Sequence, residues 1–321
     1  MTVPKLLGMV FAFVLLLAAS CPNKPVEFGP RWYVGPAAPL RQGLLDIWGS
    51  APSDIWAVGP RDTALHLTGA DWSSVPLNSA ASNRVDSVWG RSASDVWAVG
   101  DHKGGLVHWD GSNWTFVSTP SPSSSFDNIG LLGVWGTPSG KIWAVGGMGK
   151  SLYWDGSNWT AIFRPEAETL WDVWGASDSD VWAVGQTELT TGVVMRWVGS
   201  NWSPASIPAA PALLGIWGFA ANDIWAVGEG GATLHWDGSS WTSVSTGVSE
   251  RLTGIWGAAP DDVWAVGRFG TLIHWDGSAW EQEFSPIRSH FSGIWGFASN
   301  DIWAVSLQAT VIRYGMVEII P

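Results

Sequence analysis

The sequence predicts an all-β fold, a seven-bladed β-propeller of four-stranded antiparallel blades whose ring is closed by an N-terminal strand. Three observations carry this prediction. The dipeptide Trp-Gly occurs seven times at intervals of 39 to 46 residues, and a second tryptophan follows each copy in a string close to Asp-Ile-Trp-Ala-Val-Gly. Four copies then contain Trp-Asp-Gly-Ser-x-Trp, with a variant in a fifth. A repeat of about 40 residues with four short strands has the size of a propeller blade.

Two sets of tryptophans mark the repeat. Those of the Trp-Gly dipeptides are Trp48, Trp89, Trp135, Trp174, Trp217, Trp256 and Trp295. Those of the second string are Trp56, Trp97, Trp143, Trp182, Trp225, Trp264 and Trp303. Both faces of the first two strands of each unit are apolar, which indicates sheets covered on both sides. We therefore expect most of these side chains to pack between neighbouring blades.

The four strands of a unit are clearest in the fifth copy. Leu213 to Trp217, Ile224 to Val227, Thr233 to Trp236 and Trp241 to Val244 are short runs rich in β-branched and aromatic residues. The Asp237-Gly238 pair between the last two runs predicts a hairpin, because glycine accepts the positive φ of such turns. The same reading applies to the other copies between residues 41 and 321, apart from the fourth strand of the seventh copy.

The seventh copy ends before its fourth strand, so the ring needs another segment to complete it. Arg31 to Val34 stands alone before the first unit, and Trp32 corresponds to the fourth-strand tryptophan of the other copies. We predict that this segment closes the last blade and removes an open sheet edge. The competing prediction is that Met316 to Ile320 takes that place.

The N-terminus predicts export. Lys5 precedes an apolar run from Leu6 to Ala19, and small residues lead to Cys21, the one cysteine of the chain. This pattern is a secretory signal peptide, and the run is shorter than the roughly 20 residues that span a bilayer. We assign residues 1–20 to the signal peptide, residues 21–40 to an anchor linker and closing strand, and residues 41–321 to the propeller.

With its cysteine directly after Ala-Ala-Ser, the N-terminal segment resembles a bacterial lipoprotein signal, although Ala18 stands where the usual leucine is found. The resemblance implies lipidation of Cys21, a membrane anchor, and a place in the cell envelope at the outer membrane or cell surface. The alternative is an ordinary secretory signal with an incidental cysteine, which would give a fully secreted chain.

The repeat unit resembles tectonin-type propeller repeats, and the Asp-Gly hairpin with its following tryptophan is similar to the Asp-box repeats of sialidase-like and photosystem-assembly propellers. In this chain the Asp and Gly are adjacent, which departs from a standard Asp box. The tectonin resemblance covers nearly everything after residue 40 and implies a carbohydrate-binding propeller, without assigning any residue.

The repeated polar residues favour structural roles. His66, His108, His235 and His274 occupy one repeat position, where a catalytic histidine would be needed only once. We expect them to hydrogen-bond within or between blades. The aspartates before the second strand are expected to cap turns rather than bind calcium. They are Asp54, Asp95, Asp180, Asp223, Asp262 and Asp301. No cofactor, metal site or catalytic motif is predicted.

Departures from the repeat on the loops after strand two and after strand four are the best guide to a ligand site, because these loops share one face of a propeller. The candidate ligand-binding residues are His102, Lys103, Arg164, Glu166, Glu168, Trp171, Arg268, Phe269, Arg288 and His290. Trp171 is the one tryptophan outside the repeat pattern. It could stack on a sugar or anchor a protein, or it could replace in the core the leucine of other copies such as Leu132 and Leu214.

Composition limits the partners. The chain has a net charge of −12 with 16 Lys and Arg, so nucleic acid is not expected, since phosphate binding needs clustered positive charge. Three functions are weighed: a non-enzymatic, monomeric surface lipoprotein that binds a protein or envelope component, a lectin with sites between blades, and an unrecognised glycoside hydrolase. The first is preferred, and the hydrolase would need a converging carboxylate pair or an arginine cluster in one cleft.

Overall fold

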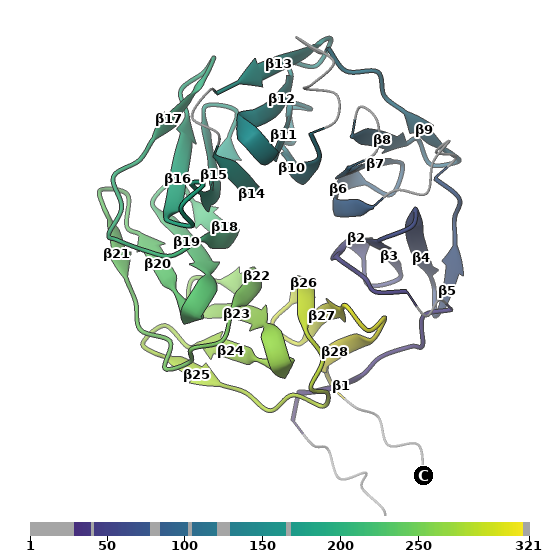
Figure 1. Cartoon of the computed structure of the whole chain (residues 1–321). Coiled ribbons are helices and arrows are strands. Elements are labelled where there is room, and N and C mark those ends of the chain that lie inside the picture. The colour runs from purple at the N-terminus through teal and green to yellow at the C-terminus, as the bar shows by residue number, and fades with distance from the viewer. Residues whose placement is uncertain are drawn as a thin grey trace, which may run out of the picture.

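The seven predicted blades form a closed ring (Figure 1). The structure is a computed structural model that describes residues 29–39, 42–77, 84–101, 105–120, 129–164 and 168–316. Each blade is a four-stranded antiparallel sheet, so the fold class is confirmed. Among the described residues, no helix has the length and apolar character needed to cross a membrane. The signal peptide and Cys21 lie outside the described residues.

The strands of each blade follow one another from the axis outward. Blades 1 to 3 contain β2 (Asp46–Ala51), β3 (Asp54–Gly59), β4 (Thr63–Thr68), β5 (Asp71–Ser74); β6 (Val85–Ser92), β7 (Asp95–Gly100), β8 (Leu106–Trp109), β9 (Trp114–Phe116); and β10 (Leu131–Gly136), β11 (Ile142–Gly146), β12 (Lys150–Trp154), β13 (Trp159–Phe163). Blades 4 and 5 contain β14 (Thr169–Ser177), β15 (Asp180–Gln186), β16 (Gly192–Trp197), β17 (Trp202–Pro204); and β18 (Leu213–Ala220), β19 (Asp223–Gly228), β20 (Thr233–Trp236), β21 (Trp241–Ser243). Blades 6 and 7 contain β22 (Leu252–Ala259), β23 (Asp262–Gly267), β24 (Leu272–Trp275), β25 (Trp280–Gln282); and β26 (Phe291–Ala298), β27 (Asp301–Ser306), β28 (Val311–Gly315), β1 (Arg31–Val34).

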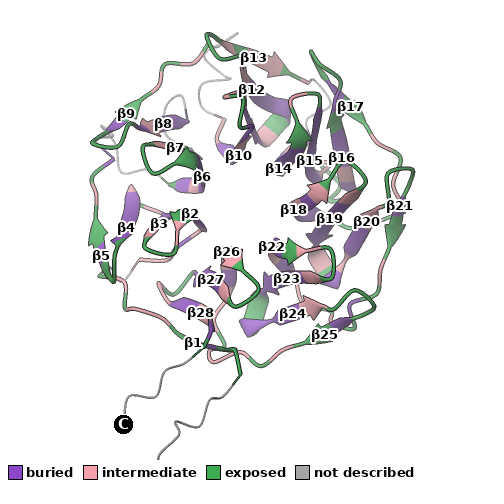
Figure 2. Ribbon diagram, turned by 180° about the vertical axis from the view of Figure 1, so that it is seen from behind, coloured by how far each residue is buried: buried purple, intermediate pink, exposed green. Residues whose placement is uncertain are grey.

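Short connections leave little of each blade outside the sheet. Figure 2 shows buried residues along the strands and exposed residues on the turns and the outer rim. In the Asp-Gly hairpin of blade 5, Gly238 has φ +93, as its turn requires. The Asp237 carboxylate accepts hydrogen bonds from the backbone N–H groups of Ser239 and Ser240, which fixes the turn. Three 3₁₀ turns, η1 (Gly147–Gly149), η2 (Glu229–Gly231) and η3 (Arg268–Gly270), follow the second strands of blades 3, 5 and 6.

The second-strand tryptophan of each blade fills the space between two blades. In blade 1, the Trp56 indole is fully buried and stacks on His66 of its own blade with ring centroids 4.0 Å apart. Trp109 and Trp114 of blade 2 meet it edge-on at 4.9 and 5.1 Å. Aromatic pairs of this kind contribute about 0.5–1.5 kcal/mol beyond the area they bury. The repeated tryptophans therefore hold neighbouring blades together, as the sequence predicts.

A second contact between blades lies on the Trp-Gly dipeptide. A Cβ added to Gly90 would stand 2.5 Å from the Trp48 indole of the preceding blade, and one on Gly218 would stand 2.6 Å from the Trp174 indole. No side chain fits at that separation, so the glycine is required by the close approach of the preceding tryptophan. The two halves of the dipeptide thus interact across a blade boundary.

The N-terminal strand closes the ring, as predicted. β1 pairs with β28 and brings Trp32 opposite Tyr314. The Trp32 indole, 5 % exposed, meets Trp264 of blade 6 edge-on at 5.5 Å, the place that Trp114 takes beside Trp56. The competing prediction placed Met316 to Ile320 on this edge; Met316 lies outside any strand, and residues 317–321 lie outside the described residues. The edge beside β28 belongs to β1.

The repeated histidines and aspartates bind each other. Nε2 of His108, His235 and His274 lies 2.7, 2.7 and 2.9 Å from the carboxylate of Asp95, Asp223 and Asp262, respectively. The predicted structural role of the histidines is therefore confirmed. The predicted turn capping by these aspartates is wrong, because the carboxylates accept hydrogen bonds across the sheet instead. In blades 4 and 7 an arginine replaces the histidine and lies over the tryptophan ring at 4.8 Å.

Truncating Trp32 should weaken the whole ring. We expect Trp32→Ala to lower the free energy of unfolding by about 3–5 kcal/mol, because a large buried side chain is removed at the closing contact. Urea denaturation measures this, with Val34→Ala on the same strand as the matched control, since Val34 is 55 % exposed. Equal stability of the two variants would show that closure does not depend on this contact.

Candidate functional site

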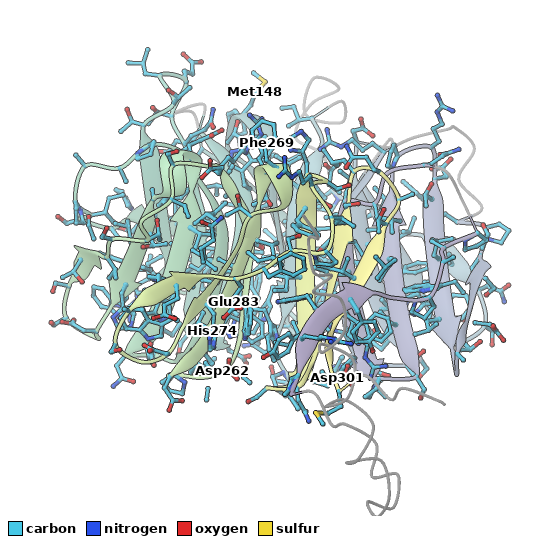
Figure 3. All side chains as sticks on the ribbon, turned by 90° about the horizontal axis from the view of Figure 1, so that it is seen from below. Met148, Asp262, Phe269, His274, Glu283 and Asp301 are labelled. Carbon is cyan, nitrogen blue, oxygen red and sulfur yellow. The ribbon has the colours of Figure 1, made fainter. Side chains whose placement is uncertain are left out.

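The two faces of the ring differ in the segments that they carry. Figure 3 places Met148 and Phe269, at the tips of the loops after the second strands, at one face, and Asp262, His274 and Asp301 toward the other. We name these the loop face and the turn face. A cavity of about 380 Å³ opens at the loop face, and strand-one residues from all seven blades line it. It therefore lies on the axis of the ring, and we name it the axial cavity.

One position of the repeat forms the wall of the axial cavity. The equivalent residues of blades 1 to 7, each three residues before the tryptophan of the Trp-Gly dipeptide, are Leu45, Asp86, Leu132, Trp171, Leu214, Thr253 and Ser292. Adjacent blades 3, 4 and 5 supply the apolar side chains Leu132, Trp171 and Leu214. Blades 6, 7 and 2 supply polar ones, and blade 1, between blades 7 and 2, supplies Leu45. The wall is thus apolar on one side and mainly polar on the other.

Basic side chains lie on the polar side. Arg251 and Arg268 come from blade 6, His290 from the linker into blade 7, and Arg84 from the linker into blade 2. Arg84 forms an ion pair with Asp86 at 2.6 Å, and Arg251 forms one with Glu229 at 3.1 Å. Arg268 has no acidic partner among the described residues. An acidic protein therefore presents one uncompensated guanidinium group at its axial cavity.

Phe269 projects from the rim. It is 67 % exposed and adopts the left-handed backbone conformation, with φ +58. The His290 ring meets it edge-on at 4.8 Å, and Nδ1 of His290 accepts a hydrogen bond from the Phe269 backbone N–H at 3.1 Å. A non-glycine residue in this conformation is uncommon and costs free energy, so the histidine contact stabilises a strained loop that exposes an aromatic ring.

Three carboxyl groups lie on the axis beneath the rim. Burial raises the pKa of Asp86 to about 7, although the Arg84 charge opposes the shift. Burial likewise raises the pKa of Asp172 to about 7 and that of Asp46 to about 6, against the hydrogen bonds that their carboxylates accept from backbone N–H groups. Among the described residues, no three His, Cys, Asp or Glu side chains are grouped so as to hold a metal ion.

Four of the predicted ligand-binding residues meet at the axial cavity: Trp171, Arg268, Phe269 and His290. Trp171 does occupy the leucine position of other copies, but this position faces the axial cavity rather than the core. His102, Lys103 and Glu166 lie outside the described residues.

The remaining predicted residues do not line the cavity. Glu168 is buried and Arg164 is half-buried, and Nε of Arg164 lies 3.5 Å from the Glu168 carboxylate. An Arg164 N–H also donates to the backbone oxygen of Trp202 in the next blade at 2.6 Å, so this pair joins blades 3 and 4. Arg288 is exposed and lies outside the cavity lining. The prediction of a ligand-contacting role for Arg164, Glu168 and Arg288 finds no support in the geometry of this site.

A second hollow, of about 580 Å³, lies between blades 4 and 5, and we name it the blade 4–5 groove. Its aromatic lining is Trp182, Trp236 and Trp241, and serines together with apolar residues such as Ile207 and Pro208 line much of the rest. Two departures from the repeat meet there: Arg196 replaces a histidine, and Val198 replaces the aspartate of the hairpin. The Arg196 guanidinium binds Asp180 at 2.9 Å while 47 % of its side chain stays exposed.

Reasoning from the sequence missed Arg84, Asp86 and Arg251 at the axial cavity and Arg196, Val198 and Trp236 at the groove. Aligning the seven copies could have found some of them, because Asp86 departs from the leucine of its repeat position and Val198 from the aspartate of its own. Arg84 and Arg251 lie in linkers, where the repeat gives no reference residue.

No protein-family model matches the sequence, and no curated protein matches it. Solved structures share the fold. YCF48 bound to a D1 peptide is 19 % identical with a TM-score of 0.67, over 90 % of this chain and 99 % of that one. A catalytically inactive virginiamycin B lyase from Staphylococcus aureus, solved with quinupristin, is 15 % identical with a TM-score of 0.76, over 90 % and 100 %. The WD40 propeller of Doa1 is 12 % identical with a TM-score of 0.70, over 88 % and 97 %.

These likenesses show the fold alone. The lyase is an enzyme by its name, whereas the YCF48 structure is a complex with a peptide. Propellers of this shape therefore serve both purposes, and the chemistry of the axial cavity has to decide between them.

The raised pKa values predict a pH-dependent stability. A carboxyl group with a folded-state pKa above its unfolded value binds a proton more tightly when folded, so its stabilisation is lost as pH rises through the folded pKa. We expect the melting temperature to fall between about pH 5 and about pH 8, and Asp86→Asn to reduce this fall by about 2–4 °C. Calorimetry across this range measures the effect.

Asp237→Asn is the matched control for Asp86→Asn. The hydroxyl of Ser239 and neighbouring backbone N–H groups lower the pKa of Asp237 to about 2, so this carboxyl does not titrate in that range. The interpretation fails if both variants keep the full slope of the wild-type protein.

Proposed function

We propose that this protein is a non-catalytic, extracytoplasmic binding propeller that holds a segment of a protein partner in the axial cavity. The observation that carries the proposal is the combination of a pre-formed cavity with an exposed aromatic ring at its rim. Phe269 is held in a strained loop at the rim of the cavity that Trp171 and Arg268 also line. Aromatic and arginine side chains supply much of the binding energy at protein interfaces.

One structural neighbour supports binding of a peptide by this fold, because the YCF48 structure contains a D1 peptide. The cavity volume of about 380 Å³ lies in the range of ligand pockets, about 300–1,000 Å³, and suits a few side chains rather than a whole domain.

The axial cavity meets only part of what a glycoside hydrolase would need. It does gather three arginines, which is one of the features that a sialidase-like site would need. Such a site would also need a tyrosine nucleophile, and the residues that line the cavity include none of the chain's three tyrosines, Tyr33, Tyr153 and Tyr314. Asp86 is engaged by Arg84, and Asp46 and Asp172 accept backbone hydrogen bonds deeper on the axis. We therefore prefer binding to catalysis.

The place of action follows from the N-terminal sequence. We propose that Cys21 is lipidated and anchors the exported chain to the cell envelope. Fractionation of cells that express Cys21→Ser should find the protein in the soluble fraction, because the variant has no anchor. Membrane retention of the variant would contradict the proposal.

Photo-crosslinking tests the partner site. A photoreactive amino acid in place of Phe269 should form a covalent adduct in the native cells, and Trp171→Ala should reduce its yield several-fold because the apolar wall is lost. The same photoreactive group at Phe284, which is 79 % exposed but lies outside the cavity lining, is the matched control. Equal adducts from both positions would contradict a site at the axial cavity.

A carbohydrate-binding function is the second candidate, favoured by the blade 4–5 groove. Trp236 is half-buried there beside exposed Ser239 and Ser240, and an aromatic face with neighbouring hydroxyl groups suits a sugar ring. The hairpins of blades 2, 3, 5 and 6 carry an aspartate, such as Asp155 and Asp237, and blade 4 has Val198 in its place. The negative charge along these hairpins is therefore interrupted at Val198.

A glycan array tests this second candidate. Saturable binding that is competed by free sugar and lost in Trp236→Ala would support it, with Trp275→Ala in the next blade as the matched control. An array without signal from a well-folded protein excludes the lectin function for the sugars displayed and leaves the axial cavity as the site of function.

A further inference from the structure

The two sides of the axial cavity differ in chemistry and come from different blades. Leu132, Trp171 and Leu214 form a continuous apolar wall from three adjacent blades. On the opposite side, blade 6 contributes Arg251 and Arg268, and the linker into blade 2 contributes Arg84. A purely apolar ligand would leave the Arg268 guanidinium without an acidic partner, and a small inorganic anion would leave the apolar wall in contact with water. Neither kind of ligand suits both walls.

The charges of the cavity are not balanced. Arg84 and Arg251 each have an acidic partner, in Asp86 and Glu229. Arg268 has none among the described residues. Arg251 and Arg268 are also close enough to repel each other: burial lowers the pKa of Arg251, the Glu229 charge raises it, and the Arg268 charge lowers it further. A carboxylate placed between the two guanidinium groups would relieve this repulsion, and arginine binds carboxylates through paired hydrogen bonds.

We propose that the axial cavity recognises a carboxylate next to an apolar side chain, as found at the C-terminal end of a polypeptide or in an acidic, apolar peptide segment. The carboxylate binds Arg251 and Arg268, and the neighbouring side chain packs on Trp171 and Leu214. This inference rests on the proposed function and specifies its ligand. It also explains how a chain of net charge −12 attracts an acidic segment, because the attraction is local to the arginine side of the cavity.

A peptide selection on the full-length protein in detergent tests this inference. A library of random hexapeptides with free C-termini is selected for binding, and the selected peptides are resynthesised as free acids and as uncharged analogues, with a C-terminal amide or with Asn and Gln for Asp and Glu. We expect a carboxylate beside an aliphatic or aromatic residue in the selected peptides. We expect the uncharged analogues to bind at least about tenfold more weakly, an amount typical of a hydrogen bond to a charged group.

Variants of the protein assign the effect to residues. Arg268→Gln replaces an exposed side chain that forms no ion pair. This variant should bind the free-acid peptides several-fold more weakly and bind the uncharged analogues as tightly as the wild-type protein does. In Arg251→Gln/Arg268→Gln the free acids and the analogues should bind equally. Trp171→Ala should weaken binding of the free-acid peptides and of the uncharged analogues by the same factor. Arg288→Gln is the matched control, because Arg288 is an exposed arginine of the same face outside the cavity lining.

The outcomes separate this inference from the proposed function. Selected peptides that lack carboxylates but still depend on Trp171 would overturn the inference and leave peptide binding at the axial cavity in place. Acidic peptides that bind the double arginine variant as well as the wild-type protein would also overturn it. Failure to select any peptide that depends on Trp171 would contradict both.

Discussion

The contact on which the ring depends is the indole of the second-strand tryptophan, enclosed between two blades. One face of each indole lies against a histidine, arginine or tyrosine of its own blade. In blades 1 to 6 the edge of an aromatic ring from the next blade meets the indole on the other side. A four-stranded sheet alone leaves both of its faces in water. Each blade is therefore stable only beside its neighbours, and the last blade needs Trp32 to give Trp264 the same enclosure.

This constraint separates positions that must repeat from positions that are free to vary. Residues between blades pack against the second-strand indole or against the Trp-Gly dipeptide of a neighbouring blade. They therefore recur with little change. Residues at the loop-face end of strand one only line the axis, so packing does not fix them. Four different residue types are accordingly found at that single repeat position besides leucine: Asp86, Trp171, Thr253 and Ser292. Residue types can therefore change there at little cost to the fold.

Although the chain is acidic overall, basic side chains gather at the axial cavity. Carboxylates of the hairpins, such as Asp110 and Asp276, occupy the turn face, whereas arginines collect at the axial cavity on the loop face. Burial raises the pKa of three carboxyl groups nearby on the axis, those of Asp46, Asp86 and Asp172. This shift reduces the negative charge beneath the arginines near neutral pH. The axial cavity is thus less acidic than the composition of the protein suggests.

The blade number, the strand order within each blade and the closing role of Arg31 to Val34 were predictable from the sequence, because the repeat period and the alternation of apolar residues are local properties of the chain. The histidine–aspartate pairs were only half predictable: the repetition indicated a structural role, but the partner of each carboxylate depends on strand register. Trp171, Arg268, Phe269 and His290 were identified as loop residues without knowledge that they meet. Their convergence with Arg84, Asp86 and Arg251 was decided by the tertiary structure alone, because residues from different repeats come together only when seven blades close around one axis.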